Sequence, residues 1–217
     1  MKVCFLASGG GGNLKFLYLA QKLGIVRNIE LSVIADRKCK AIEFAKVNNI
    51  YSKVIQYKKD NNQDLKYELK NIEPDIIITN WHKIIDEEIV NKYKGKMINL
   101  HYSLLPAFQG LIGITPIEEA YKVGCGYIGC TCHYVDEGVD TGKIISQAIV
   151  KTDKVISEAI QEVFQKGCLI LLNSLIIVSK SNNLIHRSNN INNDFSPSLQ
   201  FDDNLFNKNF WKELSKA

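Results

Sequence analysis

The sequence predicts an α/β protein with a doubly wound, mostly parallel sheet and an antiparallel strand pair near its C-terminal part. Short apolar runs alternate with helix-like segments over the first hundred residues. One of them, Ile76 to Ile78, is apolar on both faces, as is typical of parallel strands covered on both sides. Later in the chain, two apolar runs are joined by a short polar loop, and strands joined so briefly are antiparallel neighbours.

The first apolar run, Lys2 to Ala7, is rich in strand-forming residues and ends at the glycine-rich stretch Ser8 to Asn13. Apolar residues then recur at the i, i+3, i+4, i+7 spacing of a helix face: Phe16, Leu19, Ala20 and Leu23. The order is therefore strand, glycine loop, helix.

The same alternation continues to about residue 101. Further strands are predicted at Ile29 to Ile34, Val54 to Ile55, Ile76 to Ile78 and Met97 to His101, and helices at Ala41 to Val47 and Asn61 to Asn71. The second half is predicted to hold a short helix at Pro116 to Tyr121, strands at Cys130 to Val135 and Lys143 to Val150, and a long helix from Ile156. Gly167 leaves the end of that helix open.

We expect residues 1–180 to form one domain and residues 181–217 to form a C-terminal tail that is irregular or packs late. The tail is rich in Asn and Ser, particularly from Asn189 to Asn193. Three aromatic residues are its candidate anchors to the domain: Phe206, Phe210 and Trp211.

Composition excludes several classes of protein. The 217 residues are 46% hydrophobic and 23% charged, as in globular proteins, and the net charge of +4 comes from interspersed residues. No basic arm is present to bind nucleic acid. Six cysteines without a C-x-x-C pair, and no signal peptide, predict reduced thiols in a cytoplasmic protein. The most apolar stretch, Cys168 to Val178, is too short to span a bilayer, so no membrane association is expected.

The glycine stretch is a candidate phosphate site. Successive glycines let the backbone approach a ligand, and the helix that follows presents free N–H groups. The stretch does not match G-x-x-x-x-G-K-[ST], and Lys15 stands where the dinucleotide fingerprint needs its third glycine. A turn without a ligand stays open as the alternative. The candidate phosphate-binding residues are Gly10, Gly11, Gly12 and Asn13.

Asn99 and His101 are candidates for acyl chemistry. Residues i and i+2 share a face of a strand, so both would project at the carboxyl end of their strand, where open α/β sheets bind ligands. An amide beside an imidazole can stabilise an oxyanion and manage a proton, although a strand-end histidine can also be structural. The loop Asp136 to Gly142 carries three acidic residues. A carboxylate from it would raise the pKa of His101, unless the loop is only solvated surface.

The cluster Cys130-x-Cys132-His133 is interpreted as strand packing rather than a metal site. Two cysteines on one face of a strand and a histidine on the other cannot converge on one tetrahedral zinc ion.

Three stretches together resemble the folate-dependent formyltransferases. They are S-G-G-G-G-N-L, M-I-N-L-H-Y-S-L-L-P-A-F-Q-G and G-C-T-C-H-Y-V-D-E-G-V-D-T-G-K-I-I-S-Q, and the likeness runs from Met1 to about Ile170. It is strongest to the branch that formylates glycinamide ribonucleotide in purine biosynthesis. The resemblance implies a Rossmann-like formyltransferase that moves the formyl group of 10-formyltetrahydrofolate, a co-substrate, to a primary amine. No metal is implied, and a homodimer is possible.

The resemblance also implies site residues. The family's catalytic trio falls on Asn99, His101 and Asp140, and its phosphate loop on Gly11 to Asn13. Its folate pocket falls on two segments, which comprise His82, Lys83, Ile84 and Ile85, and Asp136, Glu137, Gly138 and Val139 with Asp140. We expect the amine to add directly to the formyl carbon. Asn99 and protonated His101 would then stabilise the oxyanion while Asp140 orients and charges the imidazole.

Several departures leave the acceptor open. His82-Lys83 stands where the purine branch usually has Met-Arg, and Tyr102 where it usually has proline. The stretch Gly110 to Gly129 is a few residues longer, and Lys166 aligns near a Glu used on the substrate ribose. A nucleotide-linked amino sugar for surface polysaccharide is therefore an alternative acceptor. A non-catalytic folate or nucleotide sensor is a second alternative, which the complete catalytic trio disfavours.

Overall fold

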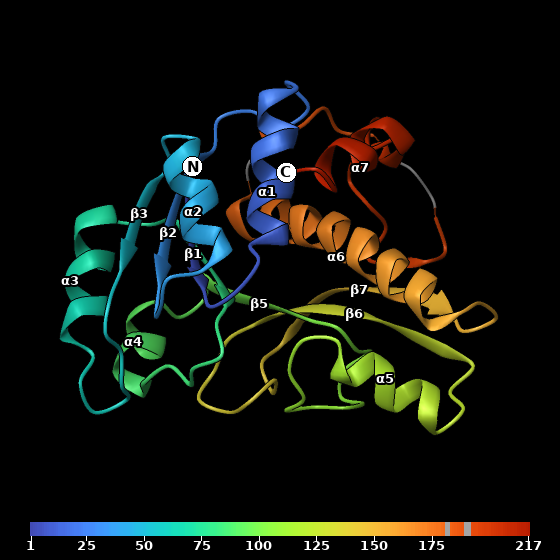
Figure 1. Cartoon of the computed structure of the whole chain (residues 1–217), viewed down its shortest axis with the longest axis horizontal. Helices are drawn as coiled ribbons and strands as arrows, with labels where there is room; N and C mark the ends of the chain where they lie inside the picture. The colour runs from blue at the N-terminus through green and yellow to red at the C-terminus, as the bar shows by residue number, and fades with distance from the viewer. Residues whose placement is uncertain (181–182, 189–191) are drawn as a thin grey trace. The chain divides into compact units, whose positions relative to one another are not determined.

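The structure is a computed structural model that describes residues 1–180, 183–188 and 192–217 (Figure 1). Within these residues the strands occur in the order β3-β2-β1-β4-β5-β6-β7-β8. The pairs β1·β2, β1·β4 and β2·β3 are parallel, whereas β6·β7 and β7·β8 are antiparallel. The predicted fold class is confirmed.

The chain divides into two compact units. The first unit comprises Met1–Ile98, Asn183–Ile185 and Lys208–Ala217, and the second comprises Asn99–Asn182 and His186–Asn207. Strand β5 (Met97–His101) crosses from the first unit into the second. The predicted division at residue 180 stays a prediction, since residues 181–182 and most of the Asn-rich run, 189–191, lie outside the described residues.

The first unit is built on parallel strands whose side chains are buried. Residues Val3 to Ala7 of β1 are at most 4% exposed, as their apolar sequence requires of a strand covered on both faces. The strands are β1 (Lys2–Ala7), β2 (Glu30–Ala35), β3 (Tyr51–Val54) and β4 (Ile76–Asn80). The third strand therefore begins three residues before the predicted Val54.

Five helices belong to the first unit: α1 (Gly12–Lys22), α2 (Lys40–Val47), α3 (Gln63–Ile72), α4 (Glu87–Lys92) and α7 (Lys208–Leu214). Helix α4 was not predicted, although Asp86 caps it by accepting from the backbone N–H of Ile89. In α7, Phe210 and Trp211 lie with ring centroids 5.6 and 5.7 Å from that of Phe16 in α1. Both aromatic residues are thus confirmed as anchors, and this part of the tail is helical rather than irregular.

The second unit pairs β6 (Tyr127–Tyr134) with β7 (Ile144–Lys151), and the short β8 (Phe195–Ser196) adds to β7. The register of β6 against β7 shifts between Cys132 and His133, which marks a β-bulge. The unit also contains α5 (Thr115–Lys122), the 3-10 helix η1 (Asp203–Leu205) and α6 (Ile156–Ser179), which packs on β6 and β7.

Helix α6 continues through Gly167 instead of ending there. A Cβ at Gly167 would lie 3.2 Å from both Leu100 Cδ2 and Tyr102 Cε1, so a glycine permits this close approach. Within the described residues, α6 is the one helix long and apolar enough to cross a membrane by length and composition alone. Buried core helices pass the same test, and 61% of its most apolar window is buried.

Candidate active site

The glycine loop lies in the first unit, where β1 ends and α1 begins. Gly11 is the N-cap of α1 and adopts a left-handed conformation with φ of 71° and ψ of 28°. No side chain caps the helix, and its first turn carries no acidic residue. No side chain therefore neutralises the positive dipole end of α1, which suits the anion site that the sequence predicts.

The glycine at position 11 is required by a close contact as well as by its conformation. A Cβ there would lie 2.8 Å from the Cβ of Ala41 in α2. The backbone N–H of Ala41 donates to the Gly9 carbonyl at 3.1 Å, which holds the two segments together. At Gly10, by contrast, a Cβ would meet no atom within 4 Å. Next along the loop, Asn13 is 5% exposed and its amide nitrogen lies 3.5 Å from Asn80 Oδ1.

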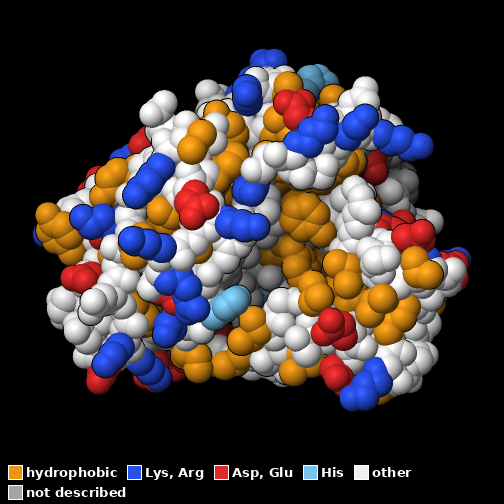
Figure 2. All heavy atoms as spheres, in the orientation of Figure 1, with side chains coloured by type: hydrophobic (Ala, Val, Ile, Leu, Met, Phe, Trp, Pro, Cys, Tyr) orange, Lys and Arg blue, Asp and Glu red, His pale blue; other side chains and the backbone are white. Residues whose placement is uncertain are grey.

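Beside this loop, α1, α2 and α7 line a hollow of about 450 Å³. Its basic residues are Lys15, Lys22 and Lys40. Lysine and arginine side chains are frequent on this face of the first unit (Figure 2). They add positive charge to the unit that carries the predicted phosphate loop.

The first predicted folate segment, His82 to Ile85, also lies in the first unit and follows β4. The backbone N–H of His82 donates to Ser8 Oγ at 3.1 Å, and the Ile84 carbonyl accepts from the Tyr57 hydroxyl at 3.3 Å. Ile84 is 62% exposed, whereas Ile85 is buried. His82 and Lys83 are exposed. The segment thus presents one apolar and two polar side chains on its surface.

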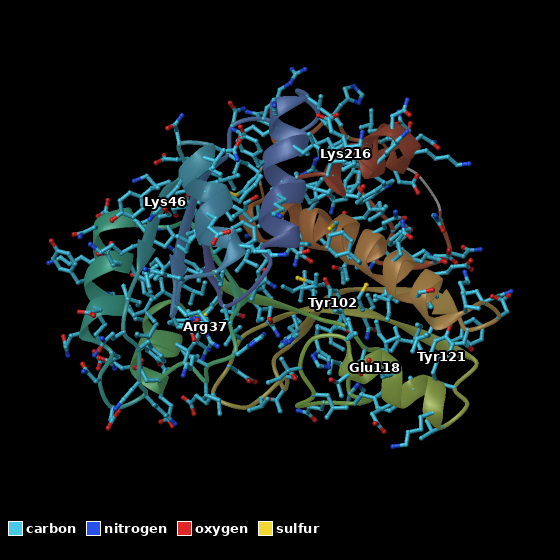
Figure 3. All side chains as sticks on the ribbon, in the orientation of Figure 1. Arg37, Lys46, Tyr102, Glu118, Tyr121 and Lys216 are labelled. Carbon is cyan, nitrogen blue, oxygen red and sulfur yellow. The ribbon has the colours of Figure 1, made fainter. Side chains whose placement is uncertain are left out.

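The catalytic candidates lie in the second unit, and the structure brings all three together. His101 Nδ1 is 3.5 Å from Asp140 Oδ2, and Asn99 Nδ2 donates to Asp140 Oδ1 at 3.3 Å. Asn99 and His101 reach the same carboxylate because they share one face of β5. His101 is 6% exposed, so the imidazole is nearly withdrawn from solvent. Tyr102, the next residue along, is labelled in Figure 3.

A turn at Phe108 to Gly110 completes the surroundings of this cluster. His101 Nε2 lies 3.2 Å from the Phe108 carbonyl oxygen, and the Gly110 N–H donates to Asp140 Oδ2 at 3.0 Å. Phe108 has a φ of 57° and Asp140 a φ of 54°. A left-handed conformation is uncommon outside glycine, and it is least expected of a bulky aromatic residue.

His133 is a member of the cluster that sequence reasoning missed. Its Nε2 is 3.3 Å from Asn99 Nδ2 and 3.6 Å from Asp140 Oδ1, and its Nδ1 is 2.8 Å from the Tyr134 carbonyl oxygen. The sequence placed His133 on the face opposite Cys130 and Cys132 but gave no sign that β6 lies beside β5, and this pairing brings the histidine to Asn99.

Burial and charge shift both ionisable partners. Burial lowers the pKa of His101 below its ordinary value, although Asp140 and the Phe108 carbonyl oppose this shift. Asp140 thus raises the pKa of His101, as expected of a neighbouring carboxylate, but desolvation of the ring outweighs this effect. Burial also acts to raise the pKa of Asp140, but hydrogen bonds from His133 and Gly110 and the neighbouring imidazoles hold it below its ordinary value.

The second predicted folate segment, Asp136 to Val139, forms an exposed loop in the second unit. Asp136 Oδ1 accepts from the Gly138 N–H at 3.1 Å and from the Thr141 hydroxyl at 2.6 Å. Glu137 is exposed, and Val139 is 48% exposed. The loop is ordered by its own hydrogen bonds and leaves an apolar side chain on its surface.

Lys166, which aligns near the ribose-binding Glu of the family, is engaged inside the second unit. Its Nζ is 2.8 Å from Asp194 Oδ2, 2.8 Å from the Ile149 carbonyl and 3.0 Å from Glu162 Oε1. These three partners occupy the donors of one ammonium group.

The cysteines offer little chemistry. Burial raises the pKa of Cys4 and Cys132 to about 12 and also raises that of Cys130 and Cys168, so these thiols stay protonated at neutral pH. In the described ranges, no group of three or more His, Cys, Asp or Glu side chains could hold a metal ion.

Comparison with known proteins agrees with this arrangement. Residues 1–175 match the formyl transferase family. The chain belongs to this family. It is 32% identical over 160 residues to the phosphoribosylglycinamide formyltransferase of Bacillus subtilis strain 168, covering 70% of this chain and 80% of that protein. The chain is thus a formyltransferase with a Rossmann-like, mostly parallel sheet.

Solved structures give the same result. The phosphoribosylglycinamide formyltransferase of Bacillus halodurans is 29% identical with a TM-score of 0.75, covering 86% of this chain and 100% of that chain. The glycinamide ribonucleotide transformylase 1 of Geobacillus kaustophilus is 30% identical with a TM-score of 0.73, covering 82% of this chain and 97% of that chain.

A shorter match is found to a sequence relative with a different name. A formyltetrahydrofolate deformylase of Escherichia coli K12 is 33% identical over 97 residues, which cover 44% of this chain and 34% of that protein.

Proposed function

We propose that this formyltransferase moves the formyl group of 10-formyltetrahydrofolate to the primary amine of 5'-phosphoribosylglycinamide, a step of purine biosynthesis. The relatives that match it over most of its length carry this activity in their names. We further propose that Asn99, His101 and Asp140 perform the chemistry, and that the enzyme is soluble and acts in the cytoplasm. A homodimer stays a prediction.

The observation that carries the proposal is the convergence of one amide and one imidazole on the same carboxylate, with the Asn99 amide and the His101 ring each within 3.5 Å of Asp140. Transfer of a formyl group to an amine passes through a tetrahedral oxyanion, and preorganised donors are the strongest means of stabilising such a charge. A carboxylate beside the imidazole orients the ring and favours its protonated form when the oxyanion develops. Asp140 is suited to this role because its pKa is held below the ordinary value.

Two donors of the cluster have partners within the protein, and the formyl oxygen must compete with these partners for them. The Asn99 amide faces Asp140 and His133, and His101 Nε2 faces the Phe108 carbonyl. Both ring nitrogens of His101 therefore face acceptors, and only the imidazolium can donate to both. We propose that the formyl oxygen takes the place of the Phe108 carbonyl at His101 Nε2 and accepts a hydrogen bond from Asn99.

The remaining groups would hold the two substrates. The loop Gly10 to Asn13 would bind the phosphate of the acceptor through backbone N–H groups. The segments His82–Ile85 and Asp136–Val139 would bind the folate, in part through the exposed side chains of Ile84 and Val139. Direct attack by the amine needs no covalent enzyme intermediate, and the four buried cysteines stay protonated.

A direct assay separates the possible acceptors. Purified protein is given 10-formyltetrahydrofolate with 5'-phosphoribosylglycinamide, with a nucleotide-linked amino sugar, or with no amine, and the formylated product and free formate are measured. We expect product only with the ribonucleotide. The amino-sugar acceptor is not favoured by the comparisons, and its formylation in preference to the ribonucleotide would overturn the proposal. Formate release without an amine would instead indicate hydrolysis.

A further inference from the structure

The turn Phe108 to Gly110 contacts the catalytic cluster through its first and third residues. Phe108 meets His101 through its carbonyl, Gly110 meets Asp140 through its N–H, and Gln109 lies between them. The Gln109 side-chain amide donates to the carbonyl of Val139 at 2.6 Å. Val139 directly precedes Asp140, so the Gln109 bond holds the loop that carries the carboxylate.

We propose that Gln109 is a positioning residue, which fastens the Asp136–Gly142 loop to the turn at Phe108–Gly110 and so sets the approach of Asp140 to His101. This inference rests on the proposed function. The Gln109 side chain bonds to the backbone of Val139 and not to the imidazole or the carboxylate, so its role is positioning rather than catalysis.

Backbone conformation explains why such a fastening is needed. Phe108 and Asp140 both hold left-handed conformations, at φ of 57° and 54°. Such conformations persist only where neighbouring contacts over-determine them. The loop Asp136 to Val139 is exposed, and the bonds within it, from Gly138 and Thr141 to Asp136, do not reach Asp140. The bonds from Gln109 and Gly110 therefore hold the loop from the side of the turn, in addition to the bond from Asn99 to Asp140.

The position of Asp140 has a measurable effect on His101. The groups that act on the imidazole are Asp140 and the Phe108 carbonyl, which raise its pKa, and His133, which lowers it. A loop that is less firmly held would place the carboxylate farther from the ring on average. The pKa of His101, already depressed by burial, would then fall further.

Substitution of Gln109 provides the test. Gln109→Met keeps the length of the side chain and removes the donor, and Gln109→Ala removes both. Gln21→Met is the matched control, because Gln21 Nε2 also donates to a backbone carbonyl at 2.6 Å, that of Ile29 in the first unit. Steady-state kinetics with 5'-phosphoribosylglycinamide gives kcat and KM, and NMR titration of the histidine ring signals gives the pKa of His101.

We expect both Gln109 variants to lower kcat about fivefold, the rate equivalent of one ordinary hydrogen bond, with little change in KM for the amine. The pKa of His101 should fall in both, and neither quantity should change in Gln21→Met. An unchanged kcat together with an unchanged His101 titration would overturn the proposal. The titration needs no substrate, so a shifted His101 in a protein that does not formylate the ribonucleotide would refute the proposed function and leave the positioning role intact.

Discussion

The glycine loop of the first unit and the Asn99–His101–Asp140 cluster of the second are built on opposite principles. The loop offers backbone N–H groups from one short run of residues, and Ala41 of α2 packs against it. The cluster offers side chains, and Asp140 comes from a segment about forty residues beyond Asn99 and His101. A binding site made of backbone groups tolerates a substitution where the new side chain meets open space, but not where another segment of the chain lies against it. Side-chain sites depend on each functional group and on whatever holds it in place.

Removal of a proposed oxyanion donor is expected to have the largest effect. His101→Ala or Asn99→Ala should lower kcat by about 10²- to 10³-fold, the usual effect of losing one preorganised donor. KM for the ribonucleotide should change little, because its phosphate would bind to the first unit. Steady-state kinetics measures both quantities. Near-normal turnover in either variant would show that the substituted residue does not stabilise the oxyanion.

Gly11→Ala should have the next largest effect. Unlike the oxyanion-donor variants, it should change KM and stability more than kcat. The new Cβ would lie 2.8 Å from that of Ala41 and would sit on a backbone with φ of 71°. We expect a loss of about 1–3 kcal/mol in the free energy of unfolding, and a raised KM for the ribonucleotide with a smaller change in kcat.

Gly10→Ala is the control, because a Cβ at Gly10 meets nothing within 4 Å. Its unfolding free energy, measured by urea denaturation, should stay near that of the wild type. Equal destabilisation by the two substitutions would show that the contact with Ala41 does not restrict position 11.

A smaller effect is expected in how the stability of the folded protein depends on pH. Because burial lowers the pKa of His101 in the folded protein, the unfolded chain takes up this proton first as the pH falls. The stability from this residue is therefore fully present well above the unfolded-state pKa of about 6.5 and is lost progressively as the pH falls below that value. His101→Gln should show a weaker dependence of Tm on pH over this range. A dependence as steep as that of the wild type would assign the effect to other groups.

Local sequence patterns were sufficient to predict much of the fold and part of the candidate site. The strand Met97 to His101 was predicted with the bounds that the structure has, and its two-residue period placed Asn99 and His101 on one face. The glycine loop followed from composition alone. The Asp86 cap of α4 was present in the sequence and was overlooked.

The rest depended on information that no local pattern contains. The position of β6 beside β5 is set by the sheet as a whole, so no local pattern could place His133 beside Asn99. The sign of the His101 pKa shift depended on the balance of burial against a carboxylate, and burial is set by the whole unit. Gln109 appeared to be an ordinary loop residue until its bond to Val139 was known.

A crystal structure of the enzyme with a stable tetrahedral mimic of the formyl-transfer intermediate would test the central claim most directly. We predict that the oxygen equivalent to the oxyanion lies within hydrogen-bond distance of Asn99 Nδ2 and His101 Nε2, with the Phe108 carbonyl displaced from the ring. Asp140 should remain on His101 Nδ1. An oxygen that faces solvent, while both donors keep the partners they have without ligand, would contradict the mechanism.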